Sequence, residues 1–111
     1  MPHMVISYAK PLEAEMEIKP LVETVWNVAE RSGLFTPAAI KSRALPVEHF
    51  VTGGSDKLFV HVEAKMFAGR TTEQKKALTK SLFDAITAMV GPQVAVSVEA
   101  IDMDKESYTK S

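Results

Sequence analysis

Hydrophobic positions follow a period of two in some segments of the chain and a helical period in others. The segment PHMVISY carries apolar side chains on both parities, with Met4 and Ile6 on one face and Val5 on the other. Such a pattern is typical of a strand that is covered on both faces. We therefore expect a central strand near the start of the chain.

From Pro20 onward the apolar residues change to a helical spacing. They form one stripe made of Leu21, Val22, Val25, Trp26 and Ala29. Pro20 suits a first helical turn, and Gly33 suits a C-terminal stop. This segment is predicted as a helix over residues 19–32.

The middle of the chain reads as two strands joined by a turn. The stretch AAIKSRALPVEHFV predicts a short strand that Pro46 interrupts, followed by the turn TGGSD. In KLFVHVEAKMF the period of two is clear, and the two faces are occupied by Leu58, Val60, Val62, Ala64 and Met66 on one side and by His61, Glu63 and Lys65 on the other. This is the clearest strand of the sequence.

A second helix and a last strand follow. Thr71 and Gln74 stand at the spacing of a capping box, and the sequence Gly91-Pro92 ends the pattern, which predicts a helix over residues 72–90. Its apolar stripe consists of Leu78, Leu82, Ala85, Ile86 and Met89. VAVSVEAI then predicts a strand whose apolar face holds Val94, Val96, Val98 and Ala100. The polar tail from Asp102 is not expected to enter the core.

The order strand, helix, strand occurs twice and predicts the fold class. Right-handed crossovers place both helices on one face of a single sheet. We expect an α+β fold of two β-α-β units with pseudo-twofold symmetry, forming a four-stranded sheet in a single domain over residues 1–111. The second face of that sheet would be bare in a monomer. Apolar residues on both parities suggest that neighbouring subunits cover it.

Composition narrows the classes of function. The chain has 111 residues, of which 46% are hydrophobic and 24% charged, as in soluble globular proteins. A net charge of -1 gives no reason to expect nucleic acid as a partner. The absence of cysteine excludes disulfides and thiolate catalysis. No apolar run is long enough to span a membrane and no signal peptide is evident, so we expect a cytoplasmic protein without a membrane partner.

Pro2 is the first candidate for chemistry. Removal of Met1 would leave Pro2 with a free secondary amine, and burial together with nearby cations would lower the pKa of that amine toward working pH. Arg70, just before the second helix, and Lys41 and Arg43, with the same parity on the second strand, provide such cations. The three histidines have no metal-ligand spacing, so a metal site is not expected.

Four segments resemble a known family. MPHMVISYAKPLEAEMEI, GLFTPAAIKSRA, FVHVEAKMFAGRTTEQKKAL and VSVEAID are similar to 5-carboxymethyl-2-hydroxymuconate isomerases. These belong to the tautomerase superfamily, with 4-oxalocrotonate tautomerase and macrophage migration inhibitory factor. The resemblance implies a cofactor-independent isomerase that acts on a small carboxylate-bearing enol or dienol in aromatic compound catabolism. It also implies a homotrimer with active sites at its interfaces.

The resemblance assigns roles to individual residues. Pro2 would move the proton as general base, and Arg70 would bind a substrate carboxylate. Where the family has IRSRA this chain has IKSRA, so Lys41 replaces the first arginine and Arg43 keeps the second. Lysine keeps the positive charge but cannot form the bidentate hydrogen bonds that arginine makes with a carboxylate.

Two other classes of function remain open at this stage. With Met1 retained, the prolyl nitrogen is an amide without useful basicity. The chain would then be a non-catalytic trimer of the same fold that binds a small acid or a protein. A ferredoxin-like interaction module shares the repeated pattern but has no need for a proline at position 2.

Overall fold

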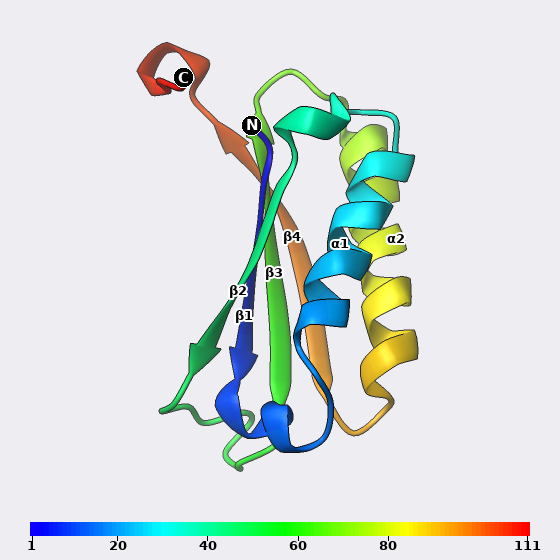
Figure 1. Ribbon diagram of the computed structural model, residues 1–111, viewed down its shortest axis with the longest axis vertical. Coiled ribbons are helices and arrows are strands. Elements are labelled where there is room, and N and C mark those ends of the chain that lie inside the picture. The colour runs from blue at the N-terminus through cyan, green and yellow to red at the C-terminus, as the bar shows by residue number, and fades with distance from the viewer.

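The computed structural model describes residues 1–111 and contains four strands and two long helices (Figure 1). In chain order these are β1 His3–Ala9, α1 Lys19–Arg31, β2 Lys41–Val47, β3 Phe59–Phe67, α2 Thr72–Val90 and β4 Ala95–Met103. Three short 3-10 helices connect or follow them, namely η1 Lys10–Ala14, η2 Pro37–Ala39 and η3 Lys105–Ser107.

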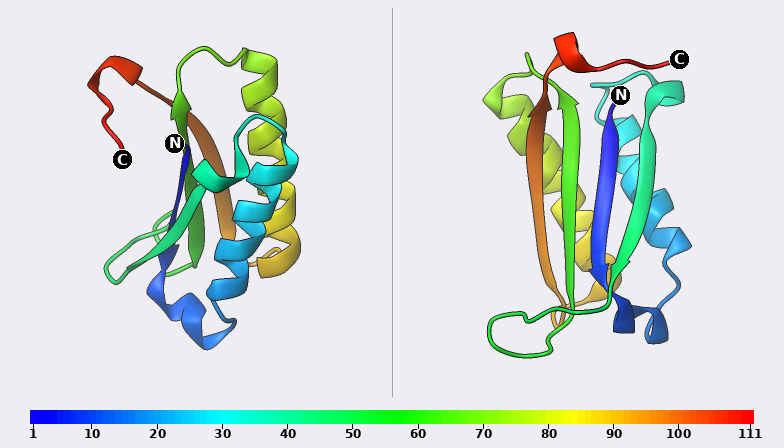
Figure 2. Two further views of the ribbon diagram at one scale, coloured as in Figure 1. Left: turned by 45° about the horizontal axis from the view of Figure 1, so that its top comes forward. Right: turned by 90° about the vertical axis from the view of Figure 1, so that its left-hand side faces the viewer.

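The four strands form one mixed sheet in the order β2-β1-β3-β4. β1 is parallel to β2, β3 is parallel to β4, and the two pairs join through the antiparallel contact of β1 with β3. Both helices cover the same face of the sheet, as Figures 1 and 2 show. The predicted fold class is therefore confirmed, including the central place of β1.

Local signals set the ends of the helices. The Thr71 hydroxyl accepts a hydrogen bond from the Gln74 N–H at 3.1 Å, and the Gln74 side chain accepts one from the Thr71 N–H at 2.8 Å, so the capping box is complete. After α1 the chain turns at Gly33, whose φ of 73° suits a residue without a Cβ. Neither long helix is apolar enough along its length to cross a membrane.

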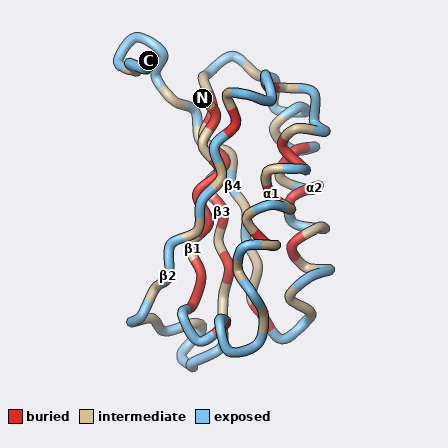
Figure 3. Tube along the Cα trace, in the orientation of Figure 1, coloured by how far each residue is buried: buried red, intermediate tan, exposed pale blue.

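The core lies between the sheet and the inner faces of the helices (Figure 3). It is built mainly from the fully buried side chains Met4, Ile6, Leu21, Val25, Val60, Val62, Ala64, Met66, Leu82 and Ile86. These positions confirm the predicted apolar faces of β1, β3 and both helices. Met89 is the exception in the α2 stripe, because it lies in the last turn and remains 36% exposed.

Pro46 does not interrupt the second strand as the sequence predicted. β2 continues through it to Val47, and Pro46 pairs with Tyr8 of β1. The reason is the position of β2 at the edge of the sheet. An edge strand needs ladder hydrogen bonds on one side only, so a residue without an N–H is tolerated there.

The second face of the sheet carries no helix, and Figure 2 shows it open in its right-hand view. The expectation that this face is apolar is wrong for its middle. Alternation along the strands places there His3, Lys41, Arg43, His61, Glu63, Lys65, Ser97 and Glu99. Val5, at the centre of this group, is still only 8% exposed. We call this surface the open face.

Candidate active site

Pro2 lies immediately before the central strand, and its side chain is fully buried. Its carbonyl oxygen accepts a hydrogen bond from the Lys41 N–H at 3.1 Å, which ties it to the start of β2. β1 is flanked by β2 and β3, so the backbone at Pro2 is held between two strands. Pro2 is therefore fixed inside the protein, although its nitrogen is an amide as long as Met1 is attached.

The surroundings of Met1 show what an amine experiences at this end of the sheet. The Met1 amine lies 3.4 Å from the Tyr108 hydroxyl, and the Met1 sulfur accepts a hydrogen bond from the Phe67 N–H at 3.3 Å. Burial lowers the pKa of this amine below its ordinary value, and the charges of Lys41 and Lys110 lower it further. The same environment favours the neutral form of a nitrogen placed here.

Lys41 and Arg43 both lie on the open face, beside β1. In the register of β1 with β2, Lys41 is opposite His3 and Arg43 is opposite Val5. An Arg43 guanidinium nitrogen lies 3.0 Å from His3 Nδ1. Burial lowers the pKa of His3, and Arg43 is the next largest cause. These two candidate residues therefore lie on the same side of the sheet, close to the start of β1.

Arg70 is held at the same end of the molecule by other contacts. Its guanidinium donates to the Leu34 carbonyl at 2.9 Å and to the Phe67 carbonyl at 3.3 Å, and it lies over the Phe35 ring at 5.1 Å. Because a guanidinium has five N–H donors, some remain free for an anion. Phe67 links Arg70 to Met1, but no contact joins Arg70 to Lys41 or Arg43.

Tyr108 and His3 also lie in this region, and the sequence did not predict a part for either of them in the site. The hydroxyl of Tyr108 lies 2.8 Å from His3 Nε2, and its ring meets the rings of Phe67 and His3 edge-on at 5.2 and 5.9 Å. The histidine had been read as structural and the tail as lying outside the core. The one available signal was that Tyr108 is the only aromatic residue in the polar tail.

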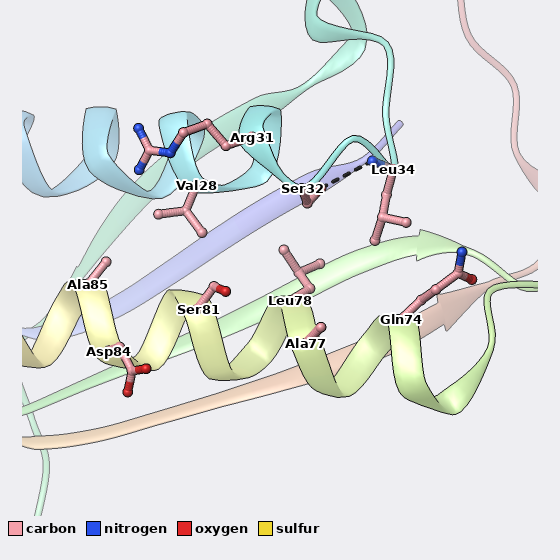
Figure 4. Close-up of a pocket in the computed structure, with 10 residues that line it drawn as sticks. All are labelled: Val28, Arg31, Ser32, Leu34, Gln74, Ala77, Leu78, Ser81, Asp84 and Ala85. Atoms are coloured by element: carbon pink, nitrogen blue, oxygen red, sulfur yellow. Dashed lines mark hydrogen bonds between the residues drawn. The ribbon is translucent and has the colours of Figure 1, made fainter.

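A groove of about 740 Å³ lies elsewhere, between α1 and α2 (Figure 4). Small and apolar side chains such as Val28, Leu78 and Ala85 form its floor, with Arg31 and Asp84 at its rim. None of the predicted site residues lines it. Nowhere in the chain do three His, Cys, Asp or Glu side chains come close enough to hold a metal ion.

Comparison with known proteins gives a match over almost the whole chain. The model of a family described as 5-carboxymethyl-2-hydroxymuconate isomerase matches residues 2–111. A curated relative is the 5-carboxymethyl-2-hydroxymuconate Delta-isomerase of Escherichia coli, 28% identical over 88 residues that cover 78% of this chain and 70% of that protein.

Solved structures agree on the fold. A 5-carboxymethyl-2-hydroxymuconate isomerase from Deinococcus radiodurans R1 superposes with a TM-score of 0.83 at 24% identity, covering 99% of this chain and 88% of that one. A fused 4-OT described as a symmetric trimer gives a TM-score of 0.75 at 20% identity, covering 99% of this chain and 90% of that one. At these identities the likeness shows the fold alone.

Proposed function

Because the chain belongs to the 5-carboxymethyl-2-hydroxymuconate isomerase family and is an isomerase of the tautomerase fold, we propose that it moves a proton between carbons of a carboxylate-bearing enol or dienol. The base is Pro2 after removal of Met1. The observation that carries this proposal is the fully buried Pro2, fixed before the central strand at a place where burial and Lys41 favour a neutral amine.

The mechanism needs one base and a set of positive charges. The prolyl nitrogen takes a proton from the enol hydroxyl or from one carbon of the substrate and returns it to a carbon of the same conjugated system, so no group is lost and no electron leaves. A buried amine beside cations has a pKa below its ordinary value, which raises the fraction of the amine that is unprotonated near neutral pH. Its return to that state after each cycle makes the amine a true catalyst.

The basic residues supply the second half of the chemistry. Negative charge develops on the substrate oxygen when the proton leaves, and preorganised cations stabilise it. Arg70 is held in place by two carbonyl groups, which suits it to grip a carboxylate. Lys41 and Arg43, beside the start of β1, would bind a second carboxylate or the carbonyl oxygen. We propose a 5-carboxymethyl-2-hydroxymuconate-like compound as the substrate, formed when an aromatic ring is cleaved.

An assay of several enols tests the proposed activity. Processed protein, checked by mass for the absence of Met1, is offered 5-carboxymethyl-2-hydroxymuconate, 2-hydroxymuconate and phenylenolpyruvate. We expect the ultraviolet absorbance of at least one enol to decay faster than in buffer. If the processed protein accelerates none of them, the proposed function is wrong. The alternative, a non-catalytic binding protein of this fold, predicts that outcome.

The substitution Lys41→Arg tests the departure from the family sequence. If Lys41 binds a carboxylate, the arginine variant should turn over a dicarboxylate as well as the parent or about two- to tenfold better, since arginine adds a two-pronged grip. The matched control is Lys57→Arg, an exposed lysine in the loop before β3. Steady-state kinetics of both variants decide. A loss of activity in Lys41→Arg alone would contradict this role.

We further propose that residues 1–111 form one domain that assembles as a homotrimer through the open face. His3, His61, Glu63 and Lys65 of this face are only partly exposed, and Val5 is nearly buried, which favours a covering partner. Light scattering after size exclusion should give three times the chain mass of 12.2 kDa at micromolar concentration. A stable monomer would contradict the assembly. Glu63→Lys adds a positive charge next to Lys65 on β3 and across Val5 from Arg43, and this charge should weaken the trimer.

A further inference from the structure

We propose that Tyr108 donates a hydrogen bond to the oxygen of the reacting enol, and that Arg43 and His3 fix the direction of this donor. The assignment rests on the proposed function, because it adds a catalytic residue to the site around Pro2. It comes from the hydrogen bonds that join β2, β1 and the C-terminal segment, three parts of the chain that are distant in sequence.

The chain of hydrogen bonds has only one possible direction. A guanidinium can donate but not accept, so the Arg43 nitrogen at 3.0 Å requires His3 Nδ1 to be the acceptor. The neutral imidazole then carries its proton on Nε2. This N–H donates to the Tyr108 oxygen at 2.8 Å. The lowered pKa of His3, caused first by burial and then by Arg43, supports the neutral ring.

The hydroxyl proton of Tyr108 is therefore not used by the protein. The other group near this oxygen is the Met1 amine at 3.4 Å, which also donates. Both neighbours of the tyrosine oxygen are thus donors, so the O–H is free to donate to an acceptor outside the chain. No side chain or backbone acceptor of the chain makes a hydrogen bond with this proton. A substrate oxygen would be the acceptor for the hydroxyl proton of Tyr108.

Removal of Met1 opens space between this donor and the proposed base. Met1 is bonded to the Pro2 nitrogen, while its amine faces Tyr108 and its sulfur meets the Phe67 N–H. Once the methionine is gone, the prolyl amine and the tyrosine hydroxyl face the same volume, about the size of one residue. The carbon that exchanges a proton with the amine can lie at Pro2 while the enol oxygen lies at Tyr108.

The donor is held rigidly although it lies in the tail. Its ring stands edge-on to both Phe67 and His3. Asp104 caps the short helix η3, and the Tyr108 N–H donates to the Lys105 carbonyl at 3.3 Å. Figure 2 shows the C-terminal segment crossing the end of the sheet where the chain begins. A preorganised donor of this kind stabilises an oxyanion without reorganisation during the reaction.

The substitution Tyr108→Phe tests the donor in the processed protein. It removes the hydroxyl and keeps the ring that packs on Phe67. We expect kcat for ketonisation of phenylenolpyruvate to fall about 10- to 100-fold with KM changed less than about threefold, as for loss of one oxyanion donor. Tyr8→Phe is the matched control, because Tyr8 is the other tyrosine of the chain and bonds Glu13 at the opposite end of β1. It should stay within about twofold of the parent.

The positioning role of His3 is tested by a double-mutant cycle. His3→Phe keeps a ring against Tyr108 but removes both nitrogens, and we expect kcat to fall about three- to tenfold. His3→Gln retains one acceptor and one donor and should recover part of this loss. In the Tyr108→Phe background, His3→Phe should cost nothing more, since the hydroxyl that it directs is absent. A purely structural effect of His3 would appear in both backgrounds.

The outcomes separate this assignment from the proposed function. Activity of Tyr108→Phe within twofold of an active parent overturns the assignment and leaves Pro2 as base untouched. Equal losses from His3→Phe in both backgrounds overturn the positioning role. An inactive processed parent overturns the proposed function, and the assignment of Tyr108 with it.

Discussion

Protein that begins at Pro2 should isomerise its enol substrate at least about 100-fold faster than protein that retains Met1. A positioned general base contributes about 10²- to 10⁴-fold to such a reaction. With Met1 attached the nitrogen is an amide, and the methionine fills the volume that the substrate needs, since its amine meets Tyr108 and its sulfur meets the Phe67 N–H. Both effects act in the same direction, which makes this the largest change that we expect.

The experiment compares two preparations of one chain. One is treated with a methionine aminopeptidase and the other is left untreated, and mass spectrometry gives the fraction of each form. Turnover should rise in proportion to the processed fraction. Circular dichroism should show the same fold in both forms. Equal turnover by the two preparations would place the base elsewhere in the molecule.

The pH dependence of the processed protein gives a second test of the same base. The amine must be unprotonated to accept a proton, so kcat/KM should fall as the pH decreases below its pKa. That pKa should lie below the ordinary value of a prolyl secondary amine, because burial and the neighbouring cations disfavour the protonated form. Pro2→Ala leaves a primary amine of different basicity, so the pH at which kcat/KM falls on the acid side should shift. An unchanged acid side of the profile would show that another group titrates there.

Arg70→Ala should lower kcat/KM about 30- to 1000-fold, because it removes about 2–4 kcal/mol of transition-state stabilisation. The guanidinium is half-buried and held by the carbonyl oxygens of Leu34 and Phe67, so its position relative to Phe67 and Met1 is fixed. Removal of the charge takes away a preorganised partner for a carboxylate. The trimer should survive, because the open face does not include Arg70.

The structure adds a complication that the sequence did not indicate. Arg70 also connects the end of β3 to the loop after α1, so its loss should lower the free energy of unfolding by about 1–3 kcal/mol. Arg70→Lys keeps the charge but not the guanidinium fork that reaches both carbonyl groups. Arg31→Ala removes an exposed arginine that lines the groove between the helices. Thermal melting and kinetics are measured on all three variants.

A role in binding requires that the kinetic effect exceed the structural one. Arg70→Ala should remain folded at the assay temperature and bind a substrate carboxylate poorly, whereas Arg31→Ala should match the parent. If Arg70→Ala is less stable but has the kcat/KM of the parent on every active substrate, Arg70 serves the fold alone.

The sequence by itself determined the helices, the apolar faces and the pairing of two β-α-β units. The bounds of α2 follow from Thr71, Gln74 and the sequence Gly91-Pro92, which act within one helical turn and need no distant partner. The faces of β3 follow from strict alternation. These features depend on neighbours in the chain, so they can be deduced from short segments. The family pattern around Pro2 and Arg70 could be recognised for the same reason.

Only the tertiary structure decided how distant residues meet. Pro46 continues β2 because that strand lies at an edge, which depends on the order of all four strands. Tyr108 reaches His3 across 105 positions of sequence, and Arg70 reaches Leu34 across 36. Such contacts form when the whole sheet and the C-terminal segment are in place, and no local periodicity encodes them. The candidate base could therefore be predicted from sequence, whereas the hydroxyl beside it is placed by the packing of the tail on the end of the sheet.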